Sequence, residues 1–514
     1  MTVRGERSAI PLLAVVAAVA IGVALWHLVG ATAGLDIVRT RVGTIPVTVF
    51  QPGAGPRGPA VVIAHGFAGS QQLMQPFAIT LARNGYTAVT FDFPGHGRNP
   101  APLPGGIEDH EAAGRALLAA LDAVVDFARA RQIGDGRVAL LGHSMASEIV
   151  VRRAVRHPDI AATVGVSLFS NDVTPELPRN LLVIVGALEP AMLKAEGYRI
   201  AGMAARGAAQ EGVTYGDIAV GTGRRLALSA GVEHIGVLYS RDSMNEVLAW
   251  MNQVFSRQSD GFVDARGPWL ALLFLGIVAL AYALARRLPV VARPPVGGGF
   301  SWRELLPVAI VPALLTPLVL WKLPTHFLPL LLGDYVACHF ALYGVLTAAG
   351  LRVISRRRAR QRSHFERASS VALALSVFAV TMFCVFAIAL PLDQFVTCFL
   401  PGTGRLTMML AMLCGTLPYF LADAWLTRGL EAARGAYAVT KILFLLSLAL
   451  AIALNPGRLF FLIIIVPAIL VLFVTHGLIA HWAWRRTQHP YPGAVANAFA
   501  FAWAMAVTFP MVSL

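Results

Sequence analysis

The stretch VALLGHSMAS, residues 138–147, is an apolar run that breaks at Gly-His-Ser and continues into a helix-like segment. A buried strand that ends here in a tight turn would leave Ser144 at the apex, with its hydroxyl exposed and the next backbone N–H free. Gly142 lets strand and helix approach closely, and Ala146 is the second small residue that such a turn needs. The stretch therefore predicts a strand–turn–helix unit that presents a nucleophilic serine.

Two further motifs lie upstream, each after a short apolar strand. HGFAGS at residues 65–70 follows the strand expected over 59–64, and DFPGHGR at residues 92–98 follows the one expected over 87–91. Together with the serine turn, these motifs resemble an α/β-hydrolase, with H-G-F after the third strand, D-x-x-G-H-G after the fourth and G-H-S-M-A after the fifth. The resemblance covers residues 36–257 and implies a serine hydrolase.

The same part of the chain alternates short strands with amphipathic helices. Helices are predicted over residues 74–84, 109–131, 146–157 and 243–255, and further strands over 162–169, 180–185 and 225–229. Strands separated by helices of this length form a parallel sheet that the helices cover. The predicted fold class for residues 35–260 is therefore an α/β-hydrolase domain, a mostly parallel sheet with helices on both faces.

A serine nucleophile needs a base that takes its proton and an acid that orients the base. In this fold the chain order is serine, acid, histidine. Two histidines of the domain follow Ser144, and His157 belongs to the helix after the serine. His234 remains, in the loop between the last strand and the last helix, where the resemblance also implies the base. We predict Ser144 as the nucleophile and His234 as the base.

The acid has two candidates. Glu189 ends the segment GALE, which follows a strand and matches the G-x-x-D/E pattern of the family, so the resemblance implies Glu189. Asp172, after the preceding strand, is the alternative. The tetrahedral oxyanion also needs preorganised donors. By resemblance these are the backbone N–H groups of Phe67 and Met145.

The sequence contains no pattern typical of a metal or cofactor site. The histidines of the domain lack the close spacing of metal ligands, and neither G-x-G-x-x-G nor a phosphate-binding loop with a following Lys-Ser/Thr occurs. His65 and His96 are expected to stabilise turns. We expect no cofactor and no metal, and the expected partners are an ester substrate and membrane lipids.

The rest of the chain is far more apolar than a soluble protein of this length. Of the 514 residues, 56% are hydrophobic, and the excess lies outside residues 35–260. Nine membrane spans are predicted, over residues 9–29, 269–285, 305–320, 327–351, 371–392, 406–425, 437–454, 459–480 and 494–512. Residues 261–514 thus predict an all-α transmembrane bundle. Residues 1–34 predict an anchor, with a cleaved signal peptide as the alternative.

Positive charges are distributed unequally between the predicted loops. With the N-terminus in the cytoplasm, the inside segments carry 18 Lys and Arg, including the run RRRARQR at residues 356–362, whereas the short outside loops carry three. This bias predicts a multi-pass protein of the cytoplasmic membrane with its catalytic domain outside the cytoplasm. The inside segments also account for the net charge of +14, which argues against a nucleic-acid partner.

Asp334 and His339 lie within the predicted span 327–351, and Asp423 lies within the predicted span 406–425. Asp334 and His339 could either hold two helices together or line a cavity that opens on the outside, since charges at depth face a bundle interior or water. Asp423 is expected at the inner membrane surface.

Two classes of function fit these features. The first is a membrane-anchored serine hydrolase that cleaves a lipid-like or other acyl ester through an acyl-enzyme. The second is a transport or assembly protein whose hydrolase-like domain binds or transfers an acyl group. A complete triad favours the first, because binding alone does not require all three residues. The eight spans after the domain favour an additional role for the membrane half.

The charge bias generates a prediction about topology. A reporter enzyme that is active only in an oxidising compartment should be active when fused after Gly261 and inactive when fused after Gln361, because the two positions lie on opposite sides of the membrane. Activity of each fusion in intact cells is the measurement. An inactive fusion at Gly261 would contradict the predicted orientation.

Overall fold

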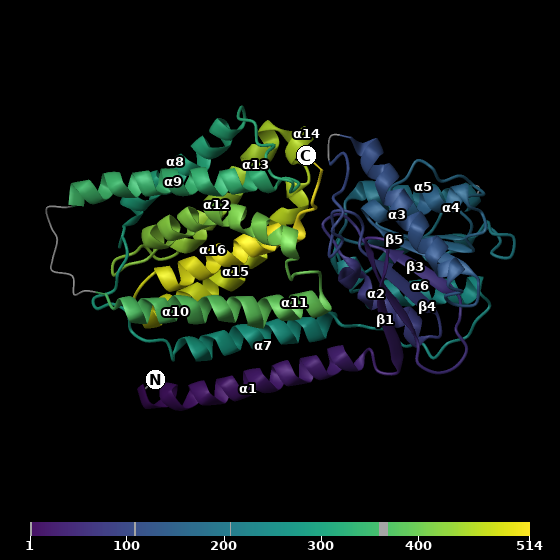
Figure 1. Ribbon diagram of the computed structural model, residues 1–514, viewed down its shortest axis with the longest axis horizontal. Coiled ribbons are helices and arrows are strands. Elements are labelled where there is room, and N and C mark those ends of the chain that lie inside the picture. The colour runs from purple at the N-terminus through teal and green to yellow at the C-terminus, as the bar shows by residue number, and fades with distance from the viewer. Residues whose placement is uncertain (1–2, 107–108, 206, 359–367, 514) are drawn as a thin grey trace.

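The computed structural model describes residues 3–106, 109–205, 207–358 and 368–513, so most of the run 356–362, with Gln361, lies outside the described residues. A sheet-containing domain sits at one end of a bundle of long helices (Figure 1). The N-terminal helix begins at the far end of the bundle, and the C-terminus lies beside the sheet domain.

The sheet has the predicted, mostly parallel arrangement. Its strands are β1 (Leu35–Val42), β2 (Ile45–Pro52), β3 (Ala60–Ala64), β4 (Thr87–Phe91), β5 (Val138–His143), β6 (Ala162–Val166), β7 (Leu181–Gly186), β8 (Thr214–Tyr215) and β9 (Arg224–Ser229). They lie in the order β1-β2-β4-β3-β5-β6-β7-β9-β8. The six central strands are parallel, whereas β1, β2 and β8 pair antiparallel. The predicted α/β-hydrolase fold is confirmed.

Alternation along the strands explains why helices cover both faces. Val61 and Ile63 of β3 belong to the apolar core under α2 (Gln75–Arg83) and α6 (Arg241–Val254). Val62 of the same strand belongs to the core on the opposite face. Successive side chains of a strand point to opposite faces, so a continuous apolar run requires cover on both sides. The helices of that second face are α3 (His110–Ala130), α4 (Met145–Arg156) and α5 (Ala191–Ala205).

The bundle contains the remaining helices. They are α1 (Val3–Gly30), α7 (Gly267–Ala285), α8 (Trp302–Leu320), α9 (Gly333–Arg358), α10 (Ser370–Phe383), α11 (Leu390–Phe395), α12 (Thr403–Thr427), α13 (Ala436–Leu454), α14 (Pro456–Leu459), α15 (Leu462–Thr487) and α16 (Tyr491–Thr508). A π-helical turn, Cys384–Ala389, joins α10 to α11. Within the described ranges, eight helices are long and apolar enough to cross a membrane, and they coincide with eight of the nine predicted spans.

The ninth predicted span corresponds to α16, which is less apolar than the other eight. This helix lies among α10, α12 and α15 (Figure 1), and most of its side chains are buried against them. A helix that contacts other helices instead of lipid does not need a uniformly apolar surface. Its position inside the bundle therefore explains its lower hydropathy.

The burial and contacts of three ionisable residues in the bundle can be compared with the expectation from the sequence. Asp423 lies near the C-terminal end of α12, where it is buried, and its carboxylate lies 2.5 Å from the Lys441 ammonium. His339 is fully buried and is hydrogen-bonded to Ser447 at 3.1 Å, so it links α9 to α13. Asp334 lines a cavity of about 960 Å³ between the bundle and the sheet domain. The helix-linking hypothesis thus fits His339, and the cavity hypothesis fits Asp334.

Arg405 of α12 joins the two parts of the chain. It is 5% exposed, and its guanidinium donates to the carbonyls of Ala506 (2.7 Å), Phe509 (2.9 Å) and Gly95 (2.8 Å). Gly95 lies in the loop after β4, and its carbonyl also accepts from the Met511 N–H at 2.8 Å. One buried cation therefore binds the C-terminal segment and a loop of the sheet domain to the bundle.

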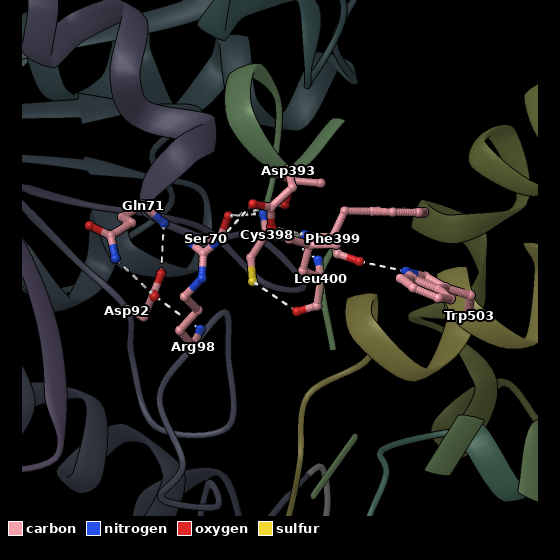
Figure 2. Close-up of polar contacts among 10 residues, drawn as sticks. Ser70, Gln71, Asp92, Arg98, Asp393, Cys398, Phe399, Leu400 and Trp503 are labelled. Carbon is pink, nitrogen blue, oxygen red and sulfur yellow. Dashed lines mark hydrogen bonds and ion pairs between the residues drawn. The ribbon is translucent and has the colours of Figure 1, made fainter. Parts of the chain in front are cut away.

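A second set of contacts between the parts is shown in Figure 2. The Ser70 hydroxyl accepts from the Cys398 N–H at 2.8 Å, and Arg98 pairs with Asp393 at 2.6 Å. Asp393 also accepts from the Phe399 N–H at 2.8 Å. Ser70 and Arg98 belong to the loops after β3 and β4, whereas the other three residues belong to α11 and the segment that follows it. The loops at the carboxyl ends of β3 and β4 are thus bound to the bundle at two places.

Arg405 generates a stability prediction. Replacing it by Met should lower the free energy of unfolding by about 3 kcal/mol, because buried carbonyls lose a charged donor. Thermal unfolding of the detergent-solubilised full chain measures this. Arg434→Met, which removes an exposed arginine of the same bundle, is the matched control and should have little effect. Equal stability of the two variants would contradict the role of Arg405.

Candidate active site

Ser144 occupies a strained turn between β5 and α4. Its φ of 52° and ψ of −119° are rare for a residue with a side chain, so the surrounding structure must hold it. The Ser144 N–H donates to the Val166 carbonyl at 2.8 Å, and the Ser147 hydroxyl donates to the Ser144 carbonyl at 2.6 Å. A Cβ at Gly142 would lie 2.5 Å from the Ala146 carbonyl oxygen, so strand and helix approach as closely as glycine permits.

The structure brings the three predicted triad residues together. His234 Nε2 lies 2.9 Å from Ser144 Oγ, and His234 Nδ1 lies 2.5 Å from Glu189 Oε1. A carboxylate can only accept, so Nδ1 carries the proton, and Nε2 is left to accept from the Ser144 hydroxyl. This is the arrangement in which a histidine can take the serine proton.

Glu189 is held by contacts that the sequence did not indicate. Its side chain is buried, and Oε2 accepts from the Ser167 hydroxyl at 3.0 Å and the Gly186 N–H at 2.7 Å. Two donors on one oxygen leave the other oxygen for His234. Asp172, the alternative acid, instead pairs with Arg152 at 3.0 Å. The geometry therefore favours Glu189, as the resemblance implied.

The two predicted oxyanion donors lie on either side of the serine turn. Met145 is the first residue of α4, and Phe67 follows Gly66 in the turn after β3. A Cβ on Gly66 would lie 3.1 Å from Ser144 Cβ, so this turn packs directly on the nucleophile. Among the residues that the structure describes, neither N–H donates a hydrogen bond. Both donors are thus free to bind a developing negative charge.

His143, the residue before Ser144, contacts the loop that carries His234. Its Nε2 donates to the His234 carbonyl at 3.0 Å, a contact that the motif alone did not reveal. Burial, and then the neighbouring His234, lower the pKa of His143 to about 3. His143 is therefore neutral at physiological pH and serves as a hydrogen-bond donor without adding charge beside the base.

His65 and His96 have the turn-stabilising contacts that were expected. His65 Nδ1 donates to the Gly66 carbonyl at 2.8 Å, and its Nε2 accepts from the Phe93 N–H at 3.2 Å. His96 Nδ1 donates to the Pro94 carbonyl at 2.9 Å. Within the described ranges, no group of three or more His, Cys, Asp or Glu side chains could hold a metal ion.

The site lies next to the helical bundle. The ring of Phe67 packs on that of Phe461, at the start of α15, with 4.6 Å between centroids. Leu188 and Ile235, which adjoin the acid and the base in sequence, are 68% and 41% exposed. The triad is thus bordered by apolar side chains of its own domain and by the end of a bundle helix.

Comparison with known proteins supports the hydrolase fold of this part of the chain. Residues 55–212 match the family described as serine aminopeptidase, S33, a family of α/β hydrolases. An uncharacterized protein of Mycobacterium tuberculosis is 28% identical over 132 residues, 25% of this chain and 44% of that protein. A bis(hydroxyethyl) terephthalate hydrolase of Streptomyces coelicolor is 29% identical over 160 residues, 29% of this chain and 48% of that enzyme. The chain spans about half the length of these curated relatives.

Two solved structures illustrate the likeness that a structural comparison finds for part of this chain. A protein of Thermus thermophilus is 13% identical and covers 44% of this chain and 99% of its own, with a TM-score of 0.34. An epoxide hydrolase of Vigna radiata is 14% identical and covers 43% of this chain and 99% of its own, with a TM-score of 0.31. The sheet order, together with the family match, identifies this part of the chain as an α/β-hydrolase domain.

His143 generates a prediction about pH. Its pKa is lower in the folded chain than the usual 6.5, so protons bind preferentially to the unfolded chain, and stability is lost as pH falls below 6.5. From pH 7.5 to 5.0 this loss is about 2 kcal/mol. His143→Gln keeps a hydrogen-bond donor that does not titrate. Between pH 7.5 and 5.0 the variant should therefore lose about 2 kcal/mol less stability than the unaltered chain.

The measurement is unfolding of the solubilised full chain at both pH values. His157→Gln, which changes an exposed histidine at the end of α4, is the control and should keep the pH dependence of the unaltered chain. If His143→Gln keeps the same dependence as well, His143 does not titrate as described.

Proposed function

We propose that the chain is a membrane-anchored serine hydrolase that cleaves a lipid-like or other acyl ester. The observation that carries the proposal is the continuous contact from Ser144 through His234 to Glu189, with distances of 2.9 and 2.5 Å. The α/β-hydrolase family match and the likeness to a hydrolase of Streptomyces coelicolor support hydrolysis as the activity.

The contacts of the triad support a two-step reaction. Ser144 Oγ attacks the ester carbonyl while its proton passes to His234 Nε2, and Glu189 stabilises the resulting imidazolium. The N–H groups of Phe67 and Met145 bind the oxyanion. When the intermediate collapses, the bond to the alcohol breaks, and the alcohol leaves with the proton from His234. Water, activated by the same histidine, then attacks the acyl-serine and releases the acid.

Two features support a membrane location with the catalytic domain outside the cytoplasm. The eight long apolar helices have the length that a bilayer requires. The positive-inside bias assigns the cytoplasm to the loops at the end of the bundle away from the hydrolase domain (Figure 1). The contact between Phe67 and Phe461 would then bring the site close to the bilayer surface.

A second candidate is transfer of the acyl group to an acceptor other than water, or its transport, with the bundle taking part. The buried Asp423–Lys441 pair favours a role for the bundle beyond anchoring, because ionisable residues inside membrane segments mark functional sites more often than structural ones. Hydrolysis releases the free acid, whereas transfer yields a new ester, so product analysis distinguishes the two.

Loss of the nucleophile gives the direct test. Ser144→Ala should abolish labelling by a fluorophosphonate probe and lower ester turnover by about 10⁶-fold, because the triad acts as a unit. His234→Ala should have a similar effect. Glu189→Gln should lower turnover by about 10⁴-fold, since it keeps the shape but not the charge.

Asp172→Asn is the matched control, because it neutralises the alternative acid, which pairs with Arg152 and not with His234. Its turnover should stay near that of the unaltered chain. Labelling of Ser144→Ala at another serine, or a larger loss for Asp172→Asn than for Glu189→Gln, would contradict the proposed triad.

A further inference from the structure

A cleft of about 760 Å³ lies between the hydrolase domain and the bundle. The last turn of α1, the strands β1 and β2, the turn Gln71–Met74 and the end of α11 form its walls. We call it the junction cleft, and the residues that matter here are Leu28, Val29, Arg39, Arg41, Gln72 and Phe395.

The wall toward the membrane is apolar. Leu28 and Val29 belong to α1, a helix with the length and composition of a membrane span, and Phe395 ends another such segment. Trp26, nearly one turn before Val29, is 79% exposed, as expected for a side chain that faces lipid. The acyl chains of a lipid that packs along α1 would therefore contact this wall at their headgroup end.

The opposite wall is basic. Of the four arginines that line the cleft, Arg98 pairs with Asp393 and Arg266 pairs with Asp264. Arg39 and Arg41 have no acidic partner in the part of the chain that the structure describes, and both are exposed. Residues two apart on a strand point to the same side, so their guanidinium groups lie on one side of β1.

Gln72 contributes a buried polar group without a partner. The residue is 4% exposed and lines the cleft, and its Oε1 accepts no hydrogen bond from the described residues. A buried acceptor without a donor is unfavourable, and a ligand hydroxyl would satisfy it.

We propose that the junction cleft binds an anionic phospholipid with a hydroxylated headgroup, of which phosphatidylglycerol is the simplest. The phosphodiester lies between Arg39 and Arg41, since arginine pairs with phosphate through two hydrogen bonds. A headgroup hydroxyl donates to Gln72 Oε1, and the acyl chains follow α1 into the bilayer. A free phosphate would leave the apolar wall unoccupied.

Binding here would hold the hydrolase domain to the bundle. Gln71 lines the cleft and contacts Asp92, which also accepts from the Arg98 N–H at 3.0 Å (Figure 2). Arg98 and Asp393 line the cleft as well, and their ion pair joins the two parts of the chain. The lipid thus lies beside the contacts that hold the loops after β3 and β4 against the bundle.

Lipid binding to the detergent-solubilised full chain, measured by native mass spectrometry, tests the proposal. The unaltered chain should bind phosphatidylglycerol at least tenfold more tightly than phosphatidylcholine, because only the former combines a net negative charge with hydroxyls. Arg39→Gln/Arg41→Gln should weaken phosphatidylglycerol binding at least tenfold, and Gln72→Leu should reduce the preference for phosphatidylglycerol over phosphatidic acid.

The matched control is Arg57→Gln/Arg131→Gln, which removes the same charge from exposed positions that precede the central strands β3 and β5 and do not line the cleft. It should bind phosphatidylglycerol like the unaltered chain. Thermal unfolding checks that all variants are folded. Equal weakening by both double variants would indicate a general charge effect and overturn the proposal. Competition by millimolar glycerol phosphate would indicate a site for a soluble anion and overturn it as well.

Discussion

The close crossing of β5 and α4 is the constraint on which the site depends. Gly142 has no room for a side chain beneath Ala146, and this contact, with the hydrogen bond from the Ser144 N–H to Val166, holds Ser144 in a strained conformation. The strain keeps the hydroxyl at the apex of the turn and sets the N–H of Met145 at a helix start. Every other site residue is placed relative to this turn.

The bundle contributes to the candidate site by holding the loops around Ser144. The turn that carries Phe67 is bound through Ser70 to the segment after α11, and the next loop is bound through Gly95 to Arg405. The segment between β6 and β7 contains no helix that could cover the site. The side chains that cover it come instead from helices that are distant in sequence. Phe461 at the start of α15 is the clearest case. The bundle of long apolar helices thus also forms a wall of the candidate site.

The positions of cations in the bundle depend on helix packing as well as on which loop or helix end carries them. Arg405, near the start of α12, is buried, and its guanidinium donates to three carbonyls. Lys441, near the start of α13, is also buried and pairs with Asp423. Loop counts indicate orientation because most cations stay in water. They do not identify the few whose burial is compensated by hydrogen bonds or an opposite charge.

The sequence by itself determined the hydrolase fold, the serine turn and the positions of most long apolar helices, because these follow from local patterns: alternation along strands, small residues around Ser144 and long apolar runs. It also indicated His234 and Glu189 through chain order and resemblance. The support of Glu189 by Ser167, the choice over Asp172 and the docking through Arg405 were decided by the tertiary structure alone. Those contacts join residues far apart in the chain, and no local pattern records which distant groups will meet when the chain folds.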